Sequence, residues 1–517
     1  MRKSRWKTTV VLGVSTAFVL AACGSSAKSS ATSTTTGAGA TTVAGAVTTP
    51  AATSGGATTP ATTTAAGSTT ATGSTTAAGT TTAGTGGSST EGLIGGVYKG
   101  IGDFSIDPKK CPADWNDKQG ITDKEIDLFV SLPKSGPLAG FGLLADGASS
   151  YFKYINDNGG IGGRSIVLDA KDDAYAPDKT KTNVDEALGA KKYAAFMTVL
   201  GTANNLAVWD TTNDECMPHL LNGTGAAQWG DVKGHPWTTG MQLDYFTEAS
   251  LWAKWLIKEH PEAKTVAELT FNNDFGKSYS SGFKFAIKGS AVSVIHQELH
   301  EATAPNLTNQ FTTLAATKAD VVLLETTGAF CTQAMAEIEK QTTWKPIVIM
   351  SGTCGSVAQF FKPLVDQGLT GANTYIIQNF KDVNDPANAN DAFVQLYKKT
   401  LTAQGLDPSK TTYATGWIYA WFMTEILKDA AGYQGGLTRG NIMLAARSIQ
   451  ETNPLLIDGL TSKMNGVKDA YLTEGGRMAK YTVTDPKTLG TFVPNGDLIN
   501  LEGQLGTYDT VKAASGG

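Results

Sequence analysis

Charged side chains are scarce in this chain. Asp, Glu, Lys and Arg make up only 17% of its 517 residues, whereas about 25% is usual in soluble globular proteins. The deficit indicates that part of the chain is not globular. The charges nearly cancel, because 42 basic side chains stand against 47 acidic ones and give a formal net charge of -5. Nucleic acid is therefore not expected as a partner, since phosphate binding needs a surplus of basic side chains on one surface.

Motifs of enzymes and of nucleotide sites are also missing. No Gly-x-Ser-x-Gly nucleophile elbow occurs. The segment 276–278 reads Gly-Lys-Ser like the end of a phosphate-binding loop, but Phe271 stands where that loop needs its first glycine. The glycine-rich segment 160–163 precedes a predicted strand, whereas a dinucleotide-binding loop follows one. We therefore predict no catalytic residues and no cofactor.

One histidine pair has metal-site spacing. The segment 296–300 reads His-Gln-Glu-Leu-His, but the zinc protease motif needs Glu directly after the first His. The preceding Val292, Val294 and Ile295 favour a strand, in which His296, Glu298 and His300 would share one face. We predict that this face is solvated and that it holds no metal.

Cysteine is rare, and its spacing excludes further chemistry. None of the five cysteines forms a Cys-x-x-Cys pair, so no metal or redox site of that kind is expected. Apart from Cys23, the cysteines form an even set with three possible pairings, at positions Cys111, Cys216, Cys331 and Cys354. An even set of this kind indicates structural disulfides and an extracytoplasmic protein.

The N-terminus predicts export. Residues 1–22 combine a basic start with an apolar run at 10–20, which is too short to remain as a membrane span and is typical of a signal peptide. The run ends in Leu20-Ala-Ala-Cys23, which resembles the lipobox of bacterial lipoproteins, where the cysteine carries a diacylglyceryl group. We predict that Cys23 anchors the mature protein to the outside of the cell membrane.

The next segment predicts a tether. Residues 23–92 are nearly all Thr, Ala, Gly and Ser, so they offer too little apolar surface to offset the entropy of ordering. A disordered coil of this length has a root-mean-square reach of roughly 45 Å. The solute-binding part of the chain is expected at 93–517.

Strand and helix patterns alternate through the first two thirds of that part. Such alternation predicts an α/β fold with parallel sheets covered by helices on both faces. Strands are predicted at 126–132, 165–170, 194–200, 217–222, 265–271, 291–299, 321–325, 346–350 and 374–378. Helices are predicted at 143–158, 179–188, 245–259, 278–287, 307–316 and 331–340. Three further helices are expected at 387–404, 413–431 and 438–448, followed by a β-rich tail from residue 477.

The loops after these strands predict a ligand site, because open α/β sheets bind ligands at the carboxyl ends of their strands. Small and hydroxyl residues fill three such loops, at 131–140, 201–205 and 222–226. At a helix start, such residues leave backbone N–H groups free to bind an anion such as a carboxylate.

Several motifs in this order resemble the type I periplasmic binding proteins, specifically the branched-chain amino acid or amide branch of the substrate-binding proteins of ABC importers. The resemblance extends from residue 121 to the end of the chain. Its motifs are Ser135-Gly-Pro-Leu-Ala139, Ile155-Asn-Asp-Asn-Gly-Gly-Ile-Gly-Gly-Arg164, Asp172-Asp173, His235-Pro-Trp-Thr-Thr239 and Asn273-Asp-Phe-Gly276.

The resemblance implies two Rossmann-like lobes with parallel sheets, joined by a hinge of three chain crossings, with the ligand between them. Lobe 1 would comprise residues 121–242 and 373–475, and lobe 2 residues 243–372 and 476–517. In this arrangement Cys331 and Cys354 lie near the ends of adjacent strands and would pair. Cys111 and Cys216 would then pin an N-terminal strap to lobe 1.

The resemblance also implies a set of ligand-binding residues. A substrate carboxylate would meet the loops after the third and fourth strands, at Thr202, Ala203, Asn204, Gly223 and Thr224. Leu138 and Ala139 would form an apolar wall, and Phe275 and Phe330 would cover the ligand from lobe 2.

One position departs from the family pattern. Amino-acid-binding relatives carry an acidic residue in the loop that corresponds to 351–355, whereas this chain has Thr353 and no carboxylate there. A buried ammonium group without a partner is strongly disfavoured. Either Glu325 or Asp274 supplies the charge, or the ligand is not an α-amino acid but a carboxylic or aromatic acid.

Together these features predict an extracytoplasmic, lipid-anchored solute-binding protein that delivers an amino acid, an amide or a related small carboxylate to ABC permease subunits. Two alternatives follow from the same residues. One is a ligand-sensing lipoprotein without transport. The other is a secreted hydrolase that uses Asp172, Asp173 or the pair His296 and His300.

Overall fold

The computed structural model describes residues 89–371, 373–483 and 488–515. The predicted signal peptide, the lipidation site Cys23 and the tether up to residue 88 lie outside the described residues. Regular structure begins with strand β1 at Gly92, one residue before the expected start of the solute-binding part. None of the described helices is long and apolar enough to cross a membrane.

The first sheet consists of five parallel strands in the order β5-β4-β6-β7-β8. Their bounds are Glu125–Leu132 for β4, Ser165–Asp172 for β5, Ala195–Met197 for β6, His219–Asn222 for β7 and Thr238–Gly240 for β8. Successive side chains of β4 point to opposite faces, and both faces are buried. Leu128 packs with α1 (Leu143–Asp157) and α11 (Thr411–Gly432), whereas Phe129 packs with α2 (Pro177–Gly189). Burial on both faces explains why three apolar residues follow one another at 128–130 of this strand.

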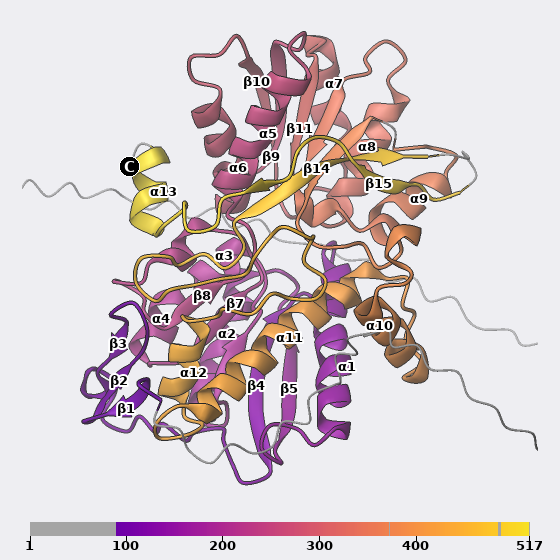
Figure 1. The fold of residues 1–517 in the computed structure, drawn as a ribbon. Coiled ribbons are helices and arrows are strands. Elements are labelled where there is room, and N and C mark those ends of the chain that lie inside the picture. The colour runs from indigo at the N-terminus through magenta and orange to yellow at the C-terminus, as the bar shows by residue number, and fades with distance from the viewer. Residues whose placement is uncertain (1–88, 372, 484–487, 516–517) are drawn as a thin grey trace, which may run out of the picture. The chain divides into compact units, whose positions relative to one another are not determined.

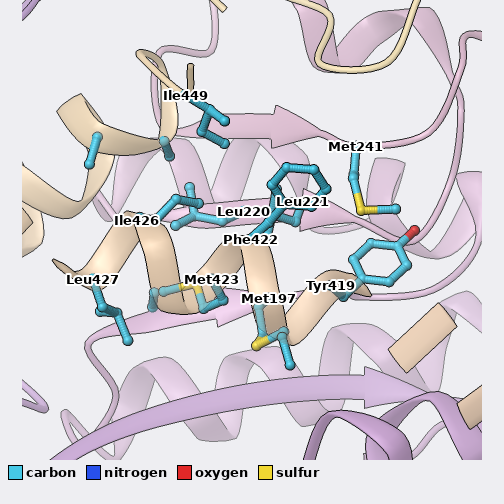
Figure 2. Packing of buried hydrophobic residues seen from close by; sticks show 14 of the residues in the cluster. Met197, Leu220, Leu221, Met241, Tyr419, Phe422, Met423, Ile426, Leu427 and Ile449 are labelled. Atoms are coloured by element: carbon cyan, nitrogen blue, oxygen red, sulfur yellow. The ribbon is translucent and has the colours of Figure 1, made fainter. Parts of the chain in front are cut away.

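Helix α11 returns to the first sheet from far along the chain. It lies beside α1 in front of β4 and β5, and α12 (Arg439–Ala446) follows it (Figure 1). Figure 2 shows Phe422, Met423 and Ile426 of α11 packed against Leu220 and Leu221 of β7. Leu221 has a φ of 51°, which breaks the strand's alternation and allows two consecutive leucines to join one core.

The second sheet has eight strands, seven of them in the order β10-β9-β11-β12-β13-β14-β15, with β16 paired to β14. Strands β9 to β13 are parallel to one another. Strand β14 runs antiparallel to β13, and β15 and β16 each run antiparallel to β14. The parallel strands are β9 (Thr265–Phe271), β10 (Ser293–His300), β11 (Val321–Glu325), β12 (Ile347–Met350) and β13 (Thr374–Gln378). The antiparallel strands are β14 (Gly475–Thr482), β15 (Thr491–Pro494) and β16 (Ile499–Asn500).

Helices cover both faces of the second sheet. Val266 of β9 packs with α5 (Tyr245–Glu259) and α6 (Asp274–Ala286), and Ala267 packs with α7 (Thr308–Thr317) and α8 (Ala329–Lys340). We call the first sheet with its helices lobe 1 and the second sheet with its helices lobe 2. The chain crosses between the lobes after β8, after β13 and before β14.

The remaining elements are short. An N-terminal sheet contains β1 (Gly92–Ile94), β2 (Val97–Lys99) and β3 (Ser105–Ile106). The other short helices are α3 (Thr202–Leu206), α4 (Trp209–Asp214), α9 (Lys362–Val365), α10 (Ala392–Ala403), α13 (Tyr508–Ser515) and a π-helical turn at Val357–Phe361.

The predicted α/β fold with parallel sheets is confirmed, with three differences in detail. Strand β13 pairs with β12 and β14 of lobe 2, whereas residues from 373 onward were assigned to lobe 1, so the crossing follows β13. The tail ends in the helix α13 after its strands. His300 is buried, with 2% of its surface exposed, so the face it was expected to share with His296 and Glu298 is solvated only in part.

Both disulfide pairings are confirmed. Cys111 pairs with Cys216 and Cys331 pairs with Cys354, with Cα atoms 5.6 and 5.7 Å apart. The first bond closes the N-terminal strap onto lobe 1, where Trp115 Nε1 also donates a hydrogen bond to the Cys216 carbonyl at 3.0 Å. The second joins the start of α8 to the turn after β12.

Candidate ligand-binding site

A cavity of about 240 Å³ lies at the carboxyl ends of the strands and is lined by residues of both lobes. Three stretches contribute most of its wall: the crossing after β8 with the start of α5, the segment 376–383 that leaves β13, and the first turn of α11. The position is the one expected for a ligand of parallel α/β sheets, where side chains from several strand ends converge.

The wall of this cavity is mainly apolar. Aromatic and aliphatic side chains from both lobes surround it: Phe141, Leu144, Leu200, Leu243, Phe275, Phe360, Ile376 and Ile377. Polar side chains also contribute to the wall: Gln242, Glu248, Thr327, Thr353, Ser356, Gln378, Asn379, Lys381, Asp382, Thr411, Thr412 and Thr415. An apolar wall with few polar groups is typical of small-molecule sites, where the polar groups orient the ligand.

Two acidic side chains line this cavity, the half-buried Asp382 and the buried Glu248. Glu248 stands in the first turn of α5 with 5% of its surface exposed. Its Oε1 accepts a hydrogen bond from the Gly352 N–H at 2.8 Å, and its Oε2 accepts one from the Tyr279 hydroxyl at 3.0 Å. Burial raises the pKa of Glu248 to about 8, although these two hydrogen bonds oppose the rise in part. The carboxyl group is therefore largely protonated at neutral pH.

The lobe 1 loops place two glycines at the cavity. Gly201 and Gly223 line it, and behind them the Thr202 and Thr224 hydroxyls hydrogen-bond to each other at 2.6 Å. Gly201 has a φ of 98°, and a Cβ atom there would lie 2.5 Å from the ring of Tyr175, which also lines the cavity. The close approach of this ring therefore requires glycine at position 201.

The other predicted lobe 1 residues lie outside the cavity wall. Asn204 is fully buried and donates to Thr180 Oγ1 at 2.8 Å. Ala203 is half-buried in α3 beside it. Leu138 is buried next to Gly328 of lobe 2, and Ala139 begins a short 3-10 turn. Phe141 and Leu144, a few residues later, supply the apolar wall expected from Leu138 and Ala139.

The predicted lobe 2 residues divide in the same way. Phe275 and Thr353 line the cavity. Asp274 is exposed at the start of α6, and Phe330 is buried in a cluster of rings with Phe271 and His300. Glu325 is fully buried and accepts a hydrogen bond from Thr270 Oγ1 at 2.6 Å. Neither Asp274 nor Glu325 belongs to the cavity wall, so neither is placed to meet a ligand there.

The sequence analysis missed Glu248, although a signal was present. Glu248, Trp252 and Trp255 are four and three residues apart, a spacing that puts them on one helix face. Both tryptophans are buried. An acidic residue on the tryptophan face of a helix directly after a chain crossing marks a buried carboxyl group, which needs a structural or functional reason.

Asp172 and Asp173, the acidic pair considered for hydrolysis, accept hydrogen bonds from neighbouring loop and helix residues. Asp172 accepts hydrogen bonds from the Ser135 hydroxyl at 2.6 Å and from the Lys134 N–H at 2.7 Å. Desolvation acts to raise the pKa of Asp172, but the hydrogen bonds outweigh it and lower the pKa to about 2. Asp173 is buried and accepts from the Ser131 and Thr180 hydroxyls at 2.8 and 2.9 Å. Neither residue lines the cavity.

Comparison with known proteins decides the family. The sequence profile of the family described as periplasmic binding protein matches residues 125–476, which is more than half of the chain. The chain belongs to this family. The expectation of a type I periplasmic binding protein is thereby confirmed, both for the sequence and for the fold.

Relatives of this periplasmic binding protein are distant. The "Leu/Ile/Val-binding protein homolog 3" of Brucella melitensis is 22% identical over 339 residues, which cover 64% of this chain and 84% of that protein. The crystal structure of a branched-chain amino acid ABC transporter protein from Thermus thermophilus with bound valine has a TM-score of 0.64 and 13% identity, covering 74% of this chain and 97% of that one. A fatty acid ABC transporter substrate-binding protein from Thermomonospora curvata has a TM-score of 0.61 and 20% identity, covering 75% and 95%.

The family makes this periplasmic binding protein a solute-binding protein of the ABC transporter type, and it implies a location outside the cytoplasm. The ligands of the similar proteins differ in class, from an amino acid to a fatty acid. The class of ligand for this chain has to be argued from its own cavity.

Proposed function

We propose that the protein is a lipid-anchored receptor of an ABC importer that captures a small amphipathic ligand with an amino or amide group. The observation that carries this proposal is the carboxyl group of Glu248 in an otherwise mainly apolar cavity lined by both lobes. A ligand that fills the cavity contacts both lobes at once. It therefore binds the closed arrangement of the lobes more tightly than the open one, which is the basis of capture.

Two features of the cavity define the ligand. Its apolar wall suits an aliphatic or aromatic side chain of the size of an amino acid, because burial of apolar surface supplies most of the binding energy. Glu248 suits a group that donates hydrogen bonds, since its ionised form pairs with an ammonium group and either form accepts from an amide. Glu248 thus takes the role that was expected from Glu325 or Asp274.

The opposite end of the ligand would meet lobe 1. Gly201 and Gly223 leave space at the strand ends next to the hydroxyls of Thr202 and Thr224. Small residues of this kind let a carboxylate approach backbone N–H groups closely. An amino acid bound in this way would span the cavity from lobe 1 to Glu248.

A ligand panel tests this function. We expect that one class among aliphatic amino acids, aromatic amino acids and amides raises the melting temperature by mass action and gives saturable heat in titration calorimetry. Fatty acids and benzoate are the comparison ligands, and a response only to these would contradict the amino or amide group. No response to any class would contradict the receptor function itself.

Transport requires a cellular test. Loss of the gene should abolish uptake of the labelled ligand, and Cys23→Ala should reduce uptake by releasing the protein from the membrane. Unchanged uptake in the deletion strain would favour the alternative of a sensing lipoprotein without transport.

A further inference from the structure

Three carboxyl groups lie close together near the start of β14, in a part of the chain that follows the cavity residues. Asp469, Glu474 and Glu502 each place one oxygen within 4.8 Å of the oxygens of the other two. None of them lines the ligand cavity. The cluster therefore has no part in the function proposed above.

Backbone hydrogen bonds hold the two segments that carry this cluster. The Ala470 N–H donates to the Gly506 carbonyl at 2.9 Å, and the Leu501 N–H donates to the Glu474 carbonyl at 2.8 Å. Directly after the second bond, Gly475 of β14 pairs with Asn500 of β16. The carboxyl groups are thus fixed by main-chain pairing and not by flexible surface loops.

The carboxyl groups are buried. Asp469 is 5% exposed and Glu474 is 1% exposed, while Glu502 is half-buried and opens the cluster toward solvent. Among the described residues, no Lys, Arg or His forms an ion pair with any of the three. The exposed Lys463 acts on Asp469 only through its charge at longer range. Two buried carboxylates beside a half-buried third one would be strongly destabilising without a cation.

Two oxygens of this cluster lack a hydrogen-bond donor. Oδ1 of Asp469 and Oε1 of Glu502 are buried and accept no hydrogen bond from the residues that the structure describes. Hydrogen-bond donors reach other oxygens of the cluster: the N–H groups of Gly503 and Leu505 donate to the two oxygens of Glu474, and the Thr461 hydroxyl donates to Oε2 of Glu502 at 3.1 Å. Buried carboxylate oxygens without a donor favour a bound cation.

The donor set selects the class of cation. All three side chains offer oxygen, and neither His nor Cys takes part, which favours a hard cation over zinc. Calcium binds oxygens at about 2.3–2.6 Å, so oxygens up to about 5 Å apart can share one ion. The separations within the cluster meet this limit. Magnesium needs a stricter octahedral shell and sheds its waters reluctantly.

We propose that Asp469, Glu474 and Glu502 form a calcium site that ties the C-terminal segment to the crossing before β14. The bound ion neutralises the buried carboxylates and links residues 469–474 to residue 502. The segment after Glu502 continues into α13, whose Val511 packs in one cluster with Ala227 of lobe 1 and Phe246 of lobe 2. Calcium therefore stabilises a segment that contacts both lobes.

Thermal unfolding of the full-length protein tests the site. We expect millimolar CaCl2 to raise the melting temperature by several degrees relative to EGTA, with a smaller effect of MgCl2, because an ion that binds only the folded state stabilises it. The variants Asp469→Asn and Glu502→Gln keep the side-chain shape and should lose this response. Asp123→Asn, which removes an exposed carboxylate elsewhere, is the matched control and should keep it.

Native mass spectrometry of the unmodified protein gives an independent measurement, with one bound calcium expected after exchange into calcium buffer. An equal melting temperature in CaCl2 and EGTA would overturn the proposal, as would a full calcium response in Asp469→Asn.

Discussion

At the scale of single residues, the ionisation of Glu248 decides which ligand fits. Burial raises its pKa to about 8, so the empty site holds a largely neutral carboxyl group at pH 7. Pairing with an ammonium group requires the ionised form, and binding below pH 8 must therefore release a proton. A ligand carboxylate would instead favour the neutral form, which can donate a hydrogen bond.

The affinity for an amino ligand should consequently depend on pH. Below the pKa of about 8, each unit of decrease in pH should weaken binding by up to roughly tenfold, because the proton must be removed from Glu248 before the pair forms. Titration calorimetry between pH 6 and about 8, in buffers of different ionisation enthalpy, measures both the affinity and the released proton.

Glu248→Gln should lower the affinity at pH 8 and abolish its pH dependence, whereas Glu262→Gln, on an exposed side chain, should leave both unchanged. Tighter binding as the pH falls would contradict the amino ligand and indicate a carboxylic acid.

At the scale of elements, the two disulfides close loops of very different length. The Cys111–Cys216 bond spans 105 residues and holds a strap with little regular structure, and the Cys331–Cys354 bond spans 23 residues inside lobe 2. Longer closed loops remove more entropy from the unfolded chain.

Removal of the disulfide that closes the longer loop should therefore lower the free energy of unfolding more. In the loop-entropy model, Cys111→Ser with Cys216→Ser should lower the free energy of unfolding by about 4–5 kcal/mol, and Cys331→Ser with Cys354→Ser by about 3 kcal/mol. Urea unfolding followed by tryptophan fluorescence measures both changes. The reverse order of the two losses would show that packing in the folded state, and not loop entropy, dominates.

The sequence predicted most elements because their patterns are local. The bounds of β9, β11, β13 and α5 match the predicted ranges, since each is an apolar run with clear ends. The sheet that β13 joins was assigned wrongly, because pairing with β12 and β14 depends on residues far along the chain. Strands β1 to β3 have only two or three residues each, too few for an alternation to be recognised.

The cavity was harder to predict than the fold. The family resemblance indicated Gly223, Phe275 and Thr353, all of which line it. It did not indicate Glu248, because an acidic residue in the first turn of a helix is ordinarily explained by the helix dipole. Its spacing from Trp252 and Trp255 puts it on the buried face of α5, and the packing of α5 against α6 places the carboxyl group next to Tyr279.

At the scale of the whole molecule, several contacts join the lobes around the cavity. The Ala329 N–H of lobe 2 donates to the Pro137 carbonyl of lobe 1 at 3.4 Å, and Thr412 of α11 donates its hydroxyl hydrogen bond to Gln359 Oε1 in lobe 2. Such contacts exist only while the lobes are close together. They belong to the arrangement that a bound ligand stabilises.

Gln359 offers a test of this closure because it joins the lobes without lining the cavity. Gln359→Ala removes one hydrogen bond of the closed arrangement, worth about 0.5–1.5 kcal/mol, and should therefore weaken ligand binding by about 2- to 12-fold. The melting temperature of the ligand-free protein should change little, since each lobe keeps its own core. Gln367→Ala, which removes a side-chain hydrogen bond to the Pro363 carbonyl of the same lobe, should leave the affinity unchanged. Equal affinities of Gln359→Ala and the unmodified protein would show that closure does not depend on this contact, and that the ligand alone holds the lobes together.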